Sequence, residues 1–301
     1  MRITSNMITN SQITAIQTNL DAMMKANDQV SSGLRFQDAS EDPAAATQVM
    51  GTKASLRALD QYKSNVTAAT NRVTQEDSVL QQINDLLGRV KQLGISQATD
   101  TATDQTKTVA NAEVQQIFKQ LVTLGNTKVG GEYLFGGDQS TTAPFSATGA
   151  GATIDYTTTN PQGQRSISIA PGQSMASTHD GTQVFVSSGI LDSVKQLARS
   201  LDPTSTTYGQ TGTSDALNSI DGAMNSLQTL IGETGANEQQ LSSTTQNLTA
   251  LKTNVTTFQN DLQGVDVEQA MTELTTRQTA YQAAMLAMSK VSDLTLTNYL
   301  K

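Results

Sequence analysis

Apolar residues recur at alternating steps of three and four positions over a long stretch that begins at Leu59. The members of this stripe are Leu59, Tyr62, Val66, Ala69, Val73, Leu80, Ile83, Leu87 and Val90, and only Glu76 interrupts it. A heptad-like repeat sustained over this span is typical of a coiled-coil-like helix. The pattern therefore predicts one long helix whose stripe packs against other helices.

Proline placement sets the limits of the predicted helices. Residues 44–143 and 204–301 contain no proline, and a proline inside a helix costs about 3 kcal/mol. Asp42 can cap the free amides of a helix, and Pro43 suits the first helical position because its missing N–H costs nothing there. We expect a helix from Pro43 to about Gln97, with a length of about 80 Å.

Further apolar stripes indicate that several helices form a bundle. One helix is expected after Asp104, ending before Gly130, with the stripe Val114, Ile117, Leu121 and Leu124. In the second proline-free tract, a stripe from Leu217 to Ile231 is expected to stop near Gly235, and another runs from Leu241 to Val265. An antiparallel bundle of residues 43–128 with 214–265 would bury these stripes together.

The region between the two tracts has a different pattern. Short β-prone runs occur at residues 153–157, 165–170 and 183–186, and glycines and prolines bound them. Alternation within the run SISIA and these turn residues predict a small antiparallel β-rich module inserted into the bundle. A module of roughly 50 residues needs support from the bundle or cover in an assembly.

Both ends of the chain carry a further apolar stripe. The N-terminal stripe consists of Ile13, Ile16, Leu20, Met23, Val30 and Leu34. The C-terminal stripe consists of Met271, Leu274, Tyr281, Met285 and Met288, and Leu300 follows near the end. Because isolated helices of this length are marginal in water, we expect the stripes to pair with each other or with neighbouring subunits. These residues are the candidate assembly interface.

Composition excludes several classes of function. The 301 residues carry a formal net charge of −8, which argues against nucleic acid or an anionic membrane as the main partner. With no Cys and one His, the chain lacks the ligands for zinc–thiolate or iron–sulfur sites and for any site with two imidazoles. No apolar stretch suffices for membrane insertion, and the first residues show no cleavable secretory signal.

The sequence predicts no catalytic, cofactor or metal site, and composition favours a structural protein over an enzyme. His179 stands beside Asp180 in a polar turn, where a lone histidine is expected at the surface. Glu76 and Asp77 are expected on a solvated helix face. An enzyme or sugar-binding adhesin in residues 138–189 is the competing class. It would depend on the scattered polar residues Asp155, Arg165, His179 and Asp180.

Three segments resemble the bacterial flagellin family. Val30–Ala46 (VSSGLRFQDASEDPAAA) is similar to the family's turn out of its first helix, with an acidic pair before an alanine-rich helix. Gly131–Gly137 (GEYLFGG) and the segment from Asp266 onward look like those of the members that join the flagellar hook to the filament. Residues 138–189 have no usable match. A filament-forming flagellin is the alternative.

The resemblance implies a mainly α fold: a long antiparallel helical bundle with coiled-coil terminal helices and a small inserted β-rich domain. Residues 1–42 and 266–301 would be the inner assembly layer, 43–137 and 190–265 a helical rod domain, and 138–189 an outward-facing domain. The chain would be exported unfolded by the flagellar type III apparatus and form an adaptor ring at the hook–filament junction.

The resemblance also implies the partners. They would be other copies in the ring, other hook-associated subunits, the filament flagellin or an adjoining junction ring, and an export chaperone on the C-terminal stripe. No nucleic acid or cofactor is expected. The terminal stripes would be disordered in the free chain and fold against neighbouring subunits, since ordering them is favourable only when both stripes pack.

Overall fold

The computed structural model of the protein describes residues 5–99, 102–176 and 178–299. The chain divides into two compact units. The terminal unit comprises residues 1–58 and 251–301, and the central unit comprises residues 59–250.

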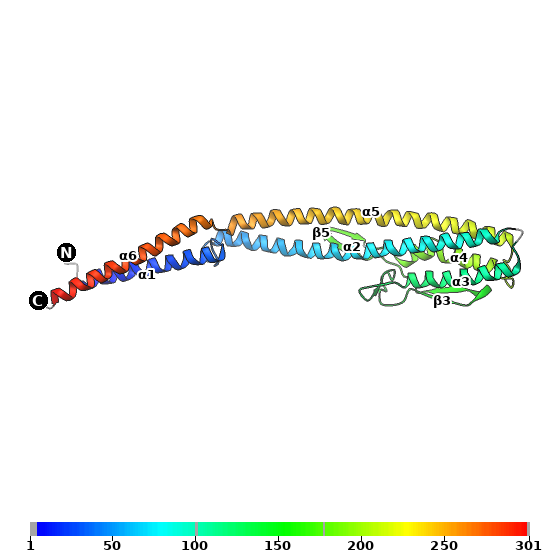
Figure 1. Ribbon diagram of the computed structural model, residues 1–301, viewed down its shortest axis with the longest axis horizontal. Coiled ribbons are helices and arrows are strands. Elements are labelled where there is room, and N and C mark those ends of the chain that lie inside the picture. The colour runs from blue at the N-terminus through cyan, green and yellow to red at the C-terminus, as the bar shows by residue number, and fades with distance from the viewer. Residues whose placement is uncertain (1–4, 100–101, 177, 300–301) are drawn as a thin grey trace. The chain divides into compact units, whose positions relative to one another are not determined.

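Helices make up most of the described residues, as the apolar stripes predict (Figure 1). They are α1 (Ser5–Ser32), α2 (Pro43–Gln97), α3 (Asp104–Gly125), α4 (Ile190–Ser200), α5 (Gln210–Gln263) and α6 (Val267–Tyr299). The Asp42 carboxylate accepts a hydrogen bond from the backbone N–H of Ala45 at 3.0 Å, and α2 begins at Pro43. The predicted start and end of α2 are therefore confirmed, and so is the mainly α fold.

The expected break near Gly235 is wrong, because α5 continues through this glycine to Gln263. A glycine inside a helix costs about 1 kcal/mol relative to alanine. Leu227 before it and Leu241 after it are fully buried in cores of the central unit. Packing on both sides outweighs the local cost, so the two predicted stripes belong to one helix.

In the terminal unit, α1 and α6 run antiparallel and lie side by side (Figure 1). Just beyond the end of α1, Leu34 forms an isolated antiparallel bridge with Gly264, which precedes α6. A small core also forms where Phe36 and Val49 pack with Leu262. The terminal unit thus joins the two ends of the chain through helix pairing and a short backbone contact.

In the central unit, α2, α3, α4 and α5 share one hydrophobic core. Fully buried members from these helices are Leu80, Ile83, Leu87, Phe118, Leu121, Leu191, Leu197, Ile220 and Leu227. A second cluster packs Val66 and Val73 of α2 against Leu241 and Leu248 of α5. The predicted packing of the long stripes is therefore confirmed within this unit.

The strands form separate antiparallel pairs, β1 with β2, β3 with β4 and β5 with β6. They are β1 (Lys128–Val129), β2 (Glu132–Tyr133), β3 (Phe145–Thr148), β4 (Asp155–Thr158), β5 (Ser166–Ala170) and β6 (Gln173–Ala176), with a short 3-10 turn η1 (Gly151–Thr153) before β4. Phe145 and Ile154 belong to the large helical core, and Ile169 and Met175 belong to the second cluster. The β-rich segment therefore takes its support from the helices.

The predicted strand at 183–186 is wrong, because these residues lie in a π-helical turn, η2 (Thr182–Ser187). Val184 and Phe185 are adjacent and both fully buried, which an alternating strand with one solvated face does not allow. The Asp180 carboxylate accepts a hydrogen bond from the backbone N–H of Gln183 at 2.8 Å and favours a turn at this point.

Within the part of the chain that the structure describes, no helix combines the length and the apolar character that crossing a membrane requires.

Candidate functional site

All of the candidate assembly residues except Leu34 and Leu300 lie on α1 and α6 of the terminal unit. On α1, Ile16, Leu20, Met23 and Val30 are partly buried, and on α6 the same holds for Leu274, Tyr281 and Met288. The two stripes therefore meet in one helix pair, which is one of the two arrangements that the sequence predicts.

Pairing leaves several large apolar side chains of these helices in solvent. Met271 is 55% exposed, Met285 48% and Leu286 68%, all on α6, and Ile13 and Met24 of α1 are exposed as well. The pairing of α1 with α6 therefore leaves these side chains uncovered.

Two of the candidate residues fall outside the helix pair. Leu34 was expected to continue the N-terminal stripe, but α1 ends at Ser32, and Leu34 instead pairs with Gly264 in the backbone bridge. The change of direction occurs at Gly33, whose φ of +70° is readily adopted by glycine. Leu300 lies outside the described residues.

Backbone hydrogen bonds fasten the base of the helix pair. The N–H of Arg35 donates to the carbonyl of Gln263 at 2.7 Å, and the N–H of Val265 donates to the carbonyl of Gly33 at 3.0 Å. The Gln263 side-chain amide also donates to the carbonyl of Phe36 at 3.1 Å. These contacts join the segment after α1 to the segment before α6. They therefore hold the end of α1 close to the start of α6.

Ion pairs add to this junction within the terminal unit. Lys25 pairs with Glu41 at 2.8 Å, and Arg35 pairs with Asp42 at 3.1 Å. The hydrogen bond from Lys25 holds the pKa of Glu41 below its ordinary value. The acidic pair therefore caps α2 through Asp42, as predicted, and also binds the basic residues around the turn.

His179 is buried, which contradicts the expectation of a surface histidine. Its ring lies between two carboxylates of the central unit. Nδ1 is 2.8 Å from Oε1 of Glu76 on α2, and Nε2 is 2.9 Å from Oε2 of Glu233 on α5. Glu76 raises the pKa of His179 most by accepting its hydrogen bond, Glu233 adds a smaller contribution, and burial opposes both.

Glu76 is fully buried, so its expected place on a solvated face is wrong. The physical reason is His179, whose ring and backbone N–H both bind Oε1 of Glu76. The interruption of the apolar stripe was the available signal, because a carboxylate at a seam position is buried and needs a partner. No pattern in the sequence identifies His179 as that partner.

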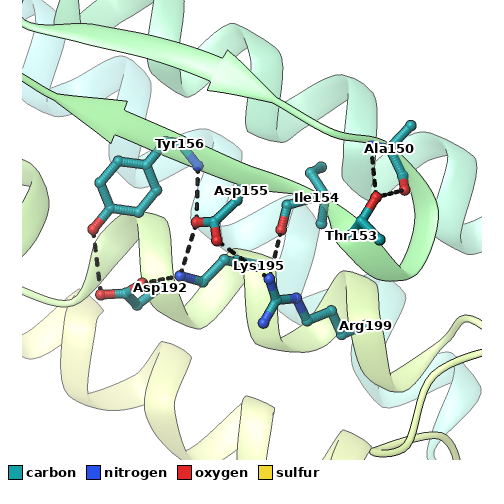
Figure 2. A network of polar contacts seen from close by, with 8 residues as sticks. All are labelled: Ala150, Thr153, Ile154, Asp155, Tyr156, Asp192, Lys195 and Arg199. Carbon is teal, nitrogen blue, oxygen red and sulfur yellow. Dashed lines mark hydrogen bonds and ion pairs between the residues drawn. The ribbon is translucent and has the colours of Figure 1, made fainter.

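A second polar cluster fastens β4 to α4 in the central unit (Figure 2). The Asp155 carboxylate accepts hydrogen bonds from Lys195 at 3.2 Å and from Arg199 at 3.4 Å. Lys195 also pairs with Asp192 at 2.7 Å, and Asp192 accepts a hydrogen bond from the Tyr156 hydroxyl. The backbone N–H of Tyr156, and then Lys195, hold the pKa of Asp155 below its ordinary value.

Of the polar residues of the competing enzyme or adhesin hypothesis, Arg165 and His179 line one cavity, and each of the four has its own polar partner. Asp155 binds Lys195 and Arg199, while Arg165 binds Glu132. His179 binds Glu76 and Glu233, and Asp180 binds the backbone of Gln183. Asp155, Arg165 and His179 thus bind residues outside the inserted segment, whereas the Asp180 contact stays within it.

Comparison with known families matches two helical regions. Residues 3–140 match the bacterial flagellin N-terminal helical region, and residues 217–300 match the bacterial flagellin C-terminal helical region.

Individual relatives agree with this result. The chain is 29% identical over 188 residues to flagellar hook-associated protein 3 of Salmonella typhimurium, covering 62% of this chain and 57% of the relative. It is 31% identical over 147 residues to the Escherichia coli protein of the same name, covering 48% and 46%. The chain thus spans about half the length of these relatives. A flagellin of Bacillus subtilis is 24% identical over 309 residues, with 96% of each chain covered.

Solved structures share the fold. The flagellar junction protein FlgL of Legionella pneumophila superposes with a TM-score of 0.58 at 15% identity, covering 71% of this chain and 100% of that chain. FlgL of Bacillus cereus gives a TM-score of 0.58 at 20% identity, covering 70% and 99%.

Proposed function

This chain belongs to the bacterial flagellin family, and we propose that it is the flagellar subunit that joins the hook to the filament. The observation that carries an assembly role is the α1–α6 pair with its exposed Met271, Met285 and Leu286. The place at the junction is supported by two relatives that bear the name flagellar hook-associated protein 3. The protein would act as an adaptor between two lattices and catalyse no reaction.

The proposed division of labour follows the elements. Residues 1–42 and 266–301 form the inner assembly layer, and residues 43–137 and 190–265 form the helical layer around it. Residues 138–189 face outward. The hairpins of this segment pack on the helices of the central unit. This packing supports the proposal that the helices act as a scaffold for the segment.

The proposed partners are other subunits of the flagellum and an export chaperone. Other copies of this chain form a ring through the terminal helices, with further hook-associated subunits or an adjoining junction ring on one side and filament flagellin on the other. Before assembly, an export chaperone covers the C-terminal stripe between Met271 and Met288. Exposed apolar side chains on α6 support the need for such a cover in the cytoplasm, because they would otherwise promote premature association.

A filament-forming flagellin remains the second candidate. The match to the Bacillus subtilis flagellin, which covers 96% of each chain, favours it.

Deletion of the gene distinguishes the two roles. Without a junction subunit, cells should carry hooks without attached filaments and release flagellin into the medium, and a plasmid copy should restore the filaments. Attached filaments in the deletion strain would contradict the junction role. Bare hooks without flagellin in the medium would favour the filament candidate.

A further inference from the structure

We propose that Glu76, His179 and Glu233 form a pH-sensitive latch that fastens the segment around His179 to α2 and α5. The inference concerns the central unit alone and does not depend on the junction role. Residues 178–189 link the β5–β6 hairpin to α4, and their only ionic bonds to both long helices in the described contacts pass through His179. The latch therefore supplies the ionic contacts that join this segment to both helices, while Val184 and Phe185 pack in the shared core.

The two carboxylates differ in their freedom to move. Glu76 is fully buried, and its Oε1 accepts hydrogen bonds from both the backbone N–H of His179 at 3.0 Å and the ring at 2.8 Å. The other oxygen, Oε2, has no hydrogen-bond partner in the structure. The Glu233 side chain, by contrast, is 58% exposed. Only Glu233 can exchange its contact with the ring for water without leaving a buried charge.

This difference determines which contact opens when the ring loses a proton. In the imidazolium form, both ring N–H groups donate, one to each carboxylate. In the neutral form, one N–H remains, and the buried Glu76 retains it because an unpaired buried carboxylate is costly. The lone pair on Nε2 then faces the Glu233 carboxylate, and repulsion moves Glu233 into solvent. The tie to α5 opens while the tie to α2 persists.

The surrounding charges favour the closed, protonated form. A cavity of 250 Å³ borders His179 and is also lined by Arg72, Arg165, Asp138 and the hydroxyl-bearing Tyr133. Glu132 binds both arginines, which reduces their repulsion of an imidazolium. Asp180 follows His179 directly in the chain. Glu76, Glu233 and these acids therefore outweigh the positive charge around the ring.

The direction of the pH dependence follows from the raised pKa of His179. Its stabilising contribution is complete below the unfolded pKa of about 6.5 and is lost as the pH rises through the higher folded pKa. The chain has one His and no Cys, so between about pH 6 and 9 only this ring and the α-amino group are expected to titrate. The latch is therefore closed while the ring is protonated and opens as the pH rises through the folded pKa of His179.

Nuclear magnetic resonance of untagged protein labelled with ¹³C-histidine tests the latch directly, because the single histidine gives one imidazole signal. The titration midpoint should lie above about 6.5, and Glu233→Gln should lower it by about one pH unit. The control Glu113→Gln removes a carboxylate from an exposed pair with Arg89 and should leave the midpoint unchanged. A wild-type midpoint at or below about 6.5, or equal midpoints in wild type and Glu233→Gln, would overturn the proposal.

Hydrogen exchange shows whether titration releases the segment. Exchange rates are first corrected for the intrinsic effect of pH on amide exchange. Above the titration midpoint, the protection factors of the amides in residues 178–189 should then fall about tenfold, which is the change in an equilibrium constant that corresponds to one pKa unit. Amides within α3 should keep their protection. Equal protection of residues 178–189 on both sides of the midpoint would rule out a latch even if the histidine titrates as expected. Because the Glu233 side chain is exposed, we expect the Glu233→Gln variant to fold. Both measurements can therefore be made on a folded protein.

Discussion

Glu76 occupies a position in the α2 stripe where its neighbours Val73 and Leu80 are apolar and buried. A buried carboxylate costs several kcal/mol unless it is paired and hydrogen-bonded. His179, 103 residues further along the chain, supplies both the charge and the hydrogen bonds. This residue pair therefore adds a polar contact to the apolar packing by which the inserted segment meets α2.

Removal of the histidine should reveal this cost. We predict that His179→Ala lowers the free energy of unfolding of the central unit by about 3 kcal/mol at pH 6, because Glu76 is left buried and unpaired. Urea unfolding followed by circular dichroism measures the change. Glu113→Ala, which breaks the exposed pair with Arg89, should cost much less, because exposed ion pairs contribute little to stability. Equal losses in the two variants would show that His179 does not neutralise Glu76.

The sequence revealed one half of this contact. Glu76 broke an otherwise apolar stripe, which is visible in the pattern alone, although it was interpreted as solvated. His179 carried no comparable signal, because a polar turn with serine, threonine and glycine is equally compatible with the surface. Its burial depends on two helices that the chain reaches before and after it, and such long-range pairing is not encoded in local composition.

At the scale of elements, Gly235 shows that a helix can continue through a glycine when the residues on either side of it are packed in a core. The residue is exposed, and a Cβ added there would meet no atom within 4 Å. We predict that Gly235→Ala stabilises the protein by about 0.5–1 kcal/mol, because alanine is the better helix former. Chemical denaturation measures the gain.

Gly94 of α2 provides the matched control. A Cβ at this helical position would lie 2.7 Å from Cδ2 of Leu217 on α5, in the central unit. Gly94→Ala should therefore bring no gain, or a loss, in the same measurement. A gain at Gly94 equal to that at Gly235 would mean that the contact between α2 and α5 is looser than the structure has it.

Element boundaries were predictable where a backbone signal and the packing agree. Pro43 and Asp42 set the start of α2 in both the sequence and the structure. At Gly235 the local signal suggested a break, but Leu227 and Leu241 hold the helix on either side. At residues 183–186, β-prone side chains suggested a strand, yet adjacent burial of Val184 and Phe185 requires a turn. Local propensity therefore does not predict the secondary structure at positions where tertiary packing outweighs it.

The terminal helices give the third prediction at this scale. Leu274→Asp combined with Met288→Asp places charges on partly buried positions of α6 and should abolish incorporation into flagella while the central unit stays folded. Electron microscopy of complemented deletion cells and circular dichroism of the purified variant measure the two effects. Thr275→Asp with Ser289→Asp adds the same charges at exposed positions and should incorporate. Normal incorporation of the Leu274 and Met288 variant would refute terminal packing as the basis of assembly.

For the whole molecule, the described contacts suggest two roles for two units. The central unit has a large core and holds its inserted segment through ionic contacts at His179 and Asp155. The terminal unit relies on a helix pair with much apolar surface still exposed. We expect neighbouring copies to cover this surface, so that the terminal helices gain order on assembly whereas the central unit folds by itself.

The proposed junction role places this protein between hook and filament. Immunogold electron microscopy of intact flagella, with an antibody against residues 138–189, locates the subunit directly. We expect a single band of label where the hook meets the filament. Label along the whole filament would contradict the junction role and identify the chain as a filament subunit.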